Sequence, residues 1–265
     1  VSERPAEEMI PLDAANPIAL ARAASTRWSY FHTHTVAPRD VQLAIEQRRS
    51  IEFDVYCGQD GVALIQHPPT FYTSPKKKRS PPCNMDLEAA IRLVEASDKS
   101  CVVVLDAKSR AALDVIRALV ARLGTDRTVV HAFVRELAFS LPIGSVRSQH
   151  WDDEDQCVDD VLRAAAPPGS PCRSAVMLTC RHVTPERLVD PEFGVLERIE
   201  REARGADVVG LWLPGGVAPP AGVCARLLRA GLLVTFNADS EPNGAEALPA
   251  PCVAMTDHLE RSSVN

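Results

Sequence analysis

The stretch IEFDVYCGQDGVALIQHPP, residues 51–69, decides the fold and introduces the first candidate site. Its first part is a short apolar run of the kind that forms a buried strand. The segment CGQDG then leads into VALIQH, so the two runs predict a strand followed by a hairpin extension. Two acids, Glu52 and Asp54, interrupt the apolar run. Because buried carboxylates are costly unless they are neutralised, we expect a specific partner for this pair.

Further apolar runs alternate with amphipathic helical segments along the chain. They are short and rich in Val, Leu and Ile, as fully buried parallel strands are. The runs are WSYFH (28–32), SIEFDVY (50–56), VALIQH (62–67), CVVVLDAK (101–108), TVVHAFV (128–134), SAVMLTC (174–180), DVVGLWL (207–213), LLVTFN (232–237) and CVAMTD (252–257). When the hairpin extension is merged with its strand, eight strands remain. Eight strands separated by helices predict an α/β fold, specifically a TIM (β/α)8 barrel.

The remaining sequence patterns agree with a single barrel domain. The chain has neither a GxGxxG motif after an early strand nor a GxSxG motif, which argues against a dinucleotide-binding sheet and an α/β-hydrolase. We expect residues 1–26, rich in Pro, Ala and Glu, to form an N-terminal arm or short leading helix. Residues 27–265 are then expected to form one barrel.

Composition excludes several classes of protein. The 265 residues are 46% hydrophobic, enough for one large core, and the net charge of −6 gives no indication of nucleic-acid binding. No apolar run approaches the roughly 18 residues of a membrane span. The beginning of the chain does not read as a signal peptide, so we expect a soluble protein and favour the cytoplasm over secretion.

The cysteines do not decide the redox compartment. None of the eight forms a CxxC pair, so a zinc ribbon is not expected. Several lie in apolar runs, where a reduced cysteine behaves as a small hydrophobic residue. A disulfide between Cys57 and Cys83 is the alternative.

Three acids are expected to meet at one end of the barrel. Side chains two apart in a strand share a face, so Glu52 and Asp54 point the same way. Asp106 and Lys108 repeat this spacing at the end of the next main strand. Barrel enzymes build their sites at this carboxyl end. Because three carboxylates so close together repel one another, we expect them to hold a divalent cation, Mg²⁺ or Ca²⁺.

Two histidines and a lysine complete the predicted chemistry. His32 ends the first strand and His67 ends the hairpin extension, where they could act as general base and general acid. Lys108 could meet a negative oxygen of the substrate. A cation, a lysine and two histidines together suit the cleavage of a phosphodiester.

Other residues near strand ends are candidate substrate contacts: His131, Arg181, Trp212 and Asn237. His131 could instead be a hydrogen-bonded core histidine. The basic run SPKKKRS, residues 74–80, could be a solvated loop or an electropositive lip that attracts an anionic substrate or a lipid headgroup.

These residues resemble the glycerophosphodiester phosphodiesterase superfamily. In that family an E-x-D pair ends strand two, a histidine follows a hairpin, and an acidic-x-Lys pair ends strand three; Glu52, Asp54, His67, Asp106 and Lys108 match these positions. Late in the chain, GLLVTFNAD and VAMTDH resemble the last two strands of the family. The resemblance covers residues from about 28 to 258. It implies a metal-dependent phosphodiesterase on a TIM barrel.

The chain also departs from the family pattern. FHTHT stands where the family has His-Arg-Gly, so an arginine that would touch phosphate is missing, and the family's usual spacing favours His32 over His34 as the catalytic histidine. HPP replaces His-Asp, and Asp106 replaces a glutamate. HPP with LDAKS is similar to the menorin-like branch.

The resemblance implies an anionic phosphodiester substrate, of the glycerophosphodiester or lysophospholipid type, cleaved by hydrolysis. The Asp-x-Lys pair is also similar to that of phospholipases related to sphingomyelinase D, which cyclise their product, so a cyclising lyase is one alternative. A barrel that binds metal or phosphate without catalysis is another.

Overall fold

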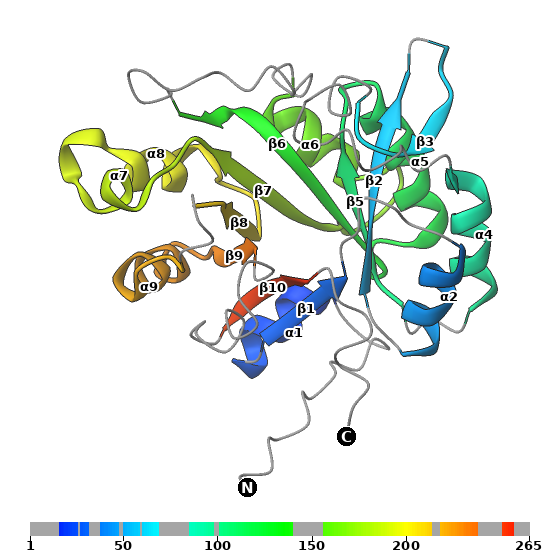
Figure 1. Ribbon diagram of the computed structural model, residues 1–265, viewed down its shortest axis with the longest axis horizontal. Helices are drawn as coiled ribbons and strands as arrows, with labels where there is room; N and C mark the ends of the chain where they lie inside the picture. Colours follow the sequence, from blue (N-terminus) through cyan, green and yellow to red (C-terminus); the bar gives the residue numbers. More distant parts are fainter. Residues whose placement is uncertain are drawn as a thin grey trace, which may run out of the picture.

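The computed structural model describes most of the chain and is shown in Figure 1. The described residues are 16–25, 27–31, 38–47, 50–58, 60–68, 85–97, 101–139, 156–213, 218–237 and 251–256. His32, His34, Cys83 and the basic run 74–80 lie outside them. Cys57 is a free thiol.

Parallel strands form a closed barrel, which confirms the predicted fold class. The barrel strands are β1 (Arg27–Phe31), β2 (Ser50–Cys57), β5 (Val103–Ala107), β6 (Thr128–Ala138), β7 (Ala175–Arg181), β8 (Val208–Leu211), β9 (Leu233–Asn237) and β10 (Cys252–Thr256). Their spatial order is β1-β10-β9-β8-β7-β6-β5-β2, and pairing between β1 and β2 closes the ring. The predicted hairpin extension is also present, since β3 (Ala63–Ile65) pairs antiparallel with β2 and then with β4 (Met85–Asp86).

Helices surround the barrel (Figure 1), and the first of them, α1, also contributes side chains to the cluster inside it. The helices are α1 (Pro17–Ala24), α2 (Pro38–Glu46), α4 (Leu87–Ala96), α5 (Ala112–Leu123), α6 (Val158–Ala165), α7 (Pro185–Val189), the 3-10 helix η2 (Pro191–Phe193), α8 (Val195–Glu202) and α9 (Ala221–Arg229). In α4 the buried positions Leu87, Ala90, Ile91 and Val94 follow the expected helical period. Gly124, with φ of 100°, follows the last residue of α5. Every helix in the described part of the chain is too short or too polar to be a membrane span.

Apolar side chains form one cluster inside the barrel and another between the barrel and its helices. One contains strand and helix side chains together and lies between the barrel and its helices. The other fills the barrel with alternate strand residues, among them Val104, Val129 and Met177, together with Ile18 and Ala21 of α1. Because side chains alternate along a strand, the residue two positions after each of these strand residues also points inward. Those inward positions carry the polar side chains of the candidate site.

Candidate metal and catalytic site

Three buried carboxylates lie at the carboxyl end of neighbouring strands. Glu52 and Asp54 of β2 are 1% and 2% exposed, and Asp106 of β5 is fully buried. In the sheet register Asp54 lies beside Asp106, which in turn lies beside His131 of β6. The convergence of acids that the alternation predicts is therefore present.

Two cationic or titratable side chains face these acids. Lys108 Nζ lies 3.2 Å from Asp54 Oδ1 and donates a hydrogen bond to Asp106 Oδ2. His67 Nε2 lies 2.9 Å from Asp54 Oδ2. Backbone hydrogen bonds hold both residues beside β2: the Gln66 amide donates to the Asp54 carbonyl at 2.9 Å, and the Lys108 amide to Val55 at 2.8 Å. The hairpin thus positions a histidine that is distant from β5 in sequence.

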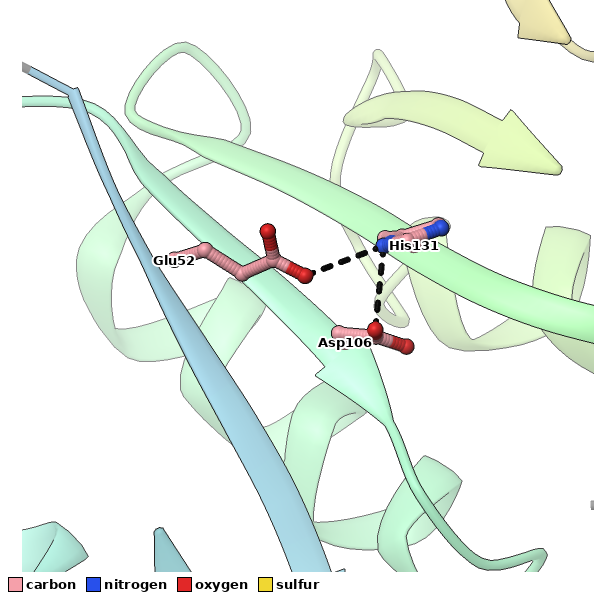
Figure 2. A group of neighbouring side chains, drawn as sticks. All are labelled: Glu52, Asp106 and His131. Carbon is pink, nitrogen blue, oxygen red and sulfur yellow. Dashed lines mark hydrogen bonds and ion pairs between the residues drawn. The ribbon is translucent and has the colours of Figure 1, made fainter. Parts of the chain in front are cut away.

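His131 lies between two of the carboxylates, as Figure 2 shows. Its Nδ1 is 3.2 Å from Glu52 Oε1 and 3.1 Å from Asp106 Oδ2. Its Nε2 is 2.8 Å from Thr179 Oγ1 on β7. The ring is 1% exposed, so these side chains, rather than bulk water, surround it.

The electrostatics of this group favour ionised side chains. Burial opposes charge on His131, but Asp106 and Glu52 outweigh burial and raise its pKa to about 10. Burial likewise opposes charge on Asp106, yet His131 and Lys108 hold the pKa of its carboxyl below the ordinary value. Asp106 and His131 therefore stabilise one another in the charged state.

The residues of this site fit a divalent cation. Glu52, Asp106 and His131 each offer a ligand atom, and these atoms lie within 4.8 Å of one another. Asp106 Oδ1 is buried and has no hydrogen-bond partner among the residues that the structure describes. A buried carboxylate oxygen without a donor is costly, and a bound cation would satisfy it.

An aromatic and cationic wall lies beside the acids. Phe133 lies two residues beyond His131 on β6. The centroid of its ring is 5.6 Å from Lys108 Nζ and 4.7 Å from Arg181 Cζ. Trp212 meets this ring edge-on at 5.1 Å. Arg181 is buried, whereas Trp212 is half-buried at the end of β8. The predicted substrate contacts Arg181 and Trp212 thus share a neighbour, Phe133, that the sequence did not single out.

The predicted site residues are largely brought together. One connected group of contacts, joined through Lys108 and Asp106, contains Glu52, Asp54, His67, Asp106, Lys108 and His131. The predicted catalytic His32 lies outside the described residues. Asn237 ends β9, but its side chain is not described.

Thr179 is a site residue that the sequence analysis missed. It lies on the inward face of β7, two residues after Met177, and this alternation is the signal that could have identified it. The neighbouring strand carries Gly210 directly opposite Thr179. A Cβ at Gly210 would press against Thr179 Oγ1 and lie 3.1 Å from Thr179 Cβ and Cγ2. The glycine therefore makes room for the hydroxyl that contacts His131.

Replacing Gly210 with alanine is expected to destabilise the protein by about 1–3 kcal/mol, because the added methyl group overpacks the barrel interior. Urea denaturation measures this change. Gly222→Ala in α9 is the matched control: its Cβ would meet no heavy atom within 4 Å in the described part of the chain. That variant should be neutral or more stable by up to about 1 kcal/mol. Equal effects of the two substitutions would contradict the close packing of Thr179 on Gly210.

Comparisons with known proteins show similarity in structure alone. No family model matches the sequence, and no curated protein matches it. A glycerophosphodiester phosphodiesterase from Thermotoga maritima matches the structure with a TM-score of 0.50 and 11% identity, over 88% of this chain and 95% of that one. A glycerophosphodiester phosphodiesterase from Agrobacterium tumefaciens str. C58 matches with a TM-score of 0.48 and 16% identity, over 88% of this chain and 95% of that one.

A third match is the tryptophan synthase alpha subunit from Legionella pneumophila str. Paris, with a TM-score of 0.44 and 11% identity over 91% of this chain and 86% of that one. The Thermotoga match shows that the chain shares the barrel fold of a glycerophosphodiester phosphodiesterase, which confirms the predicted resemblance in fold.

Proposed function

We propose that the protein is a metal-dependent phosphodiesterase that hydrolyses a glycerophosphodiester or lysophospholipid-like substrate. The observation that carries this proposal is the convergence of Glu52, Asp54 and Asp106 with Lys108 and His67 inside the barrel. The fold shared with a glycerophosphodiester phosphodiesterase supports it. Glu52 and Asp106 would hold a divalent cation. Asp54, which the sequence also predicts as a ligand, lies beside Asp106 but outside the group of candidate ligand atoms. When bound, such an ion supplies positive charge that stabilises a phosphoryl oxygen.

The chain's own residues would do the remaining work. Lys108, which contacts Asp54 and Asp106, would place a positive charge where negative charge develops on the phosphoryl group. His67 is oriented by Asp54 through its Nε2 and would transfer a proton to the leaving alcohol or from the attacking group. His32 is proposed as the second proton-transfer group. Arg181 and Trp212 are proposed to contact the substrate along the wall formed with Phe133.

The net reaction adds water across one P–O bond and releases an alcohol and a phosphomonoester. An internal hydroxyl of the substrate could attack phosphorus instead, releasing the same alcohol and a cyclic phosphodiester. Both routes use the same cation and proton-transfer groups, so the product distinguishes them.

The test is an activity screen followed by phosphorus NMR. Metal-stripped protein is given Mg²⁺, Ca²⁺, Mn²⁺ or Zn²⁺ with glycerophosphocholine, glycerophosphoethanolamine or lysophosphatidylcholine. We expect ion-dependent conversion of at least one substrate to a phosphomonoester. A cyclic product would show that the reaction is cyclisation and not hydrolysis. Tight metal binding without any conversion would contradict the proposal and favour a non-catalytic barrel.

A further inference from the structure

We propose that His131 binds the divalent ion through Nδ1, and that the site therefore selects a transition-metal ion such as Mn²⁺ or Zn²⁺ over Mg²⁺ and Ca²⁺. The inference rests on the proposed function, which brings an ion to Glu52 and Asp106. It adds a nitrogen ligand to a site that the sequence predicts as all-carboxylate. Figure 2 shows the three side chains converging from β2, β5 and β6.

The spacing of the donor atoms supports this assignment. His131 Nδ1 is 3.2 Å from Glu52 Oε1 and 3.1 Å from Asp106 Oδ2. With ligand bonds of about 2.0–2.2 Å, adjacent ligands of one ion lie roughly 3.0–3.5 Å apart. The three side chains could therefore face a common ion with little rearrangement.

The opposite side of the imidazole is held as in a metal-ligating histidine. Nε2 lies 2.8 Å from Thr179 Oγ1, so an Nε2–H that donates to this hydroxyl leaves Nδ1 as the ligand atom. Thr179 packs against Gly210, where any larger residue would displace it. Thr179 thus orients the ring through Nε2, whereas the carboxylates contact Nδ1.

A separate observation concerns the other oxygen of the same carboxylate. Asp106 Oδ2 contacts Lys108 and His131, while Asp106 Oδ1 is buried with no hydrogen-bond partner in the described part of the chain. Glu52 and Asp106 both direct an oxygen at one ring nitrogen. A bound cation would take the place of the proton on Nδ1, which is released on binding, and would also contact the carboxylates.

The chemistry of the ligands determines the class of ion. Mg²⁺ and Ca²⁺ prefer shells made of oxygen, whereas imidazole with carboxylates suits first-row transition metals and zinc. A site of two carboxylates and one imidazole should therefore favour Mn²⁺ and Zn²⁺.

The experiment uses the full chain, stripped of metal and loaded with one equivalent of Mn²⁺. Electron spin-echo envelope modulation detects an imidazole nitrogen bound to Mn²⁺. We expect ¹⁴N coupling in the wild type and in His182→Asn, which removes a histidine that directly follows β7 and is not among the candidate ligands Glu52, Asp106 and His131. His131→Gln should lose the coupling. Calorimetry should show that this variant lowers the ratio of Mn²⁺ to Mg²⁺ affinity by about tenfold or more.

Thr179→Val tests the orienting contact separately. This nearly isosteric change removes the partner of Nε2, and we expect Mn²⁺ affinity to fall about 10–100-fold while the nitrogen coupling persists. Thr179→Ser, which keeps the hydroxyl, should restore most of the affinity.

Two results would overturn the inference: Mn²⁺ bound by the wild type without nitrogen coupling, or Mg²⁺ bound as tightly as Mn²⁺. Both are read from the wild type, so a misfolded variant cannot obscure them. Nitrogen-coupled Mn²⁺ with no phosphodiester turnover would support the inference and refute the proposed function. Turnover without nitrogen coupling would refute the inference and leave the function standing.

Discussion

Replacing Lys108 with methionine is expected to lower kcat by about 10²–10³-fold, the usual loss when one charge-stabilising donor is removed from a reacting oxygen. It should also destabilise the metal-free protein by about 3–5 kcal/mol, because it leaves buried carboxylates without their cation. Lys108 is 1% exposed and contacts both Asp54 and Asp106. Methionine preserves the length of the side chain, so the change removes mainly the charge.

Urea denaturation and steady-state kinetics measure the two effects. Arg92→Met is the matched control, since it also removes one positive charge, from a side chain that is 74% exposed and pairs with Glu88 on α4. Exposed pairs contribute about 0.2–1 kcal/mol, so this control should retain activity and nearly all stability. A Lys108→Met protein as stable and as active as the control would contradict the assigned role of the lysine.

Replacing His67 with glutamine is expected to lower kcat by about 10²–10⁴-fold on a substrate with an alkyl leaving group. Its Nε2 faces Asp54, so the substitution removes a proton-transfer group that the carboxylate orients. An aryl ester such as bis(p-nitrophenyl) phosphate releases p-nitrophenolate, a weakly basic anion that can leave without being protonated. If His67 is the general acid, the loss on the aryl ester should be much smaller; if it is the base, the two losses should be similar.

Mn²⁺ affinity should remain within about threefold in His67→Gln, because its contact is with Asp54, outside the Glu52, Asp106 and His131 group. His182→Asn provides the control for loss of a histidine. If His67→Gln cleaves the alkyl substrate with the kcat of the wild type, His67 takes no part in proton transfer.

The barrel and much of its site could be predicted because short-range patterns determine them. Alternation along a strand places Glu52 with Asp54, and Asp106 with Lys108, without knowledge of any other strand. The turn at CGQDG similarly predicts the hairpin that brings His67 back to β2. These inferences need only the period of a strand and the direction of the chain.

The contacts of His131 could not be predicted, because they depend on the register between strands. The sequence places His131 on a strand but does not show that it lies beside Asp106, or that Glu52 reaches across β5 to the same nitrogen. Thr179 reaches His131 from β7 because Gly210 leaves space beside it. Such side-chain relations become visible only when several strands are placed together.

The most direct test of the account is phosphodiester cleavage by metal-stripped protein before and after a divalent ion is restored, followed by phosphorus NMR. We predict no turnover without the ion, recovery when it is added, and no recovery in Glu52→Gln under the same conditions. Full turnover by the stripped wild type, or recovery in Glu52→Gln equal to that of the wild type, would contradict a metal-dependent reaction at this site.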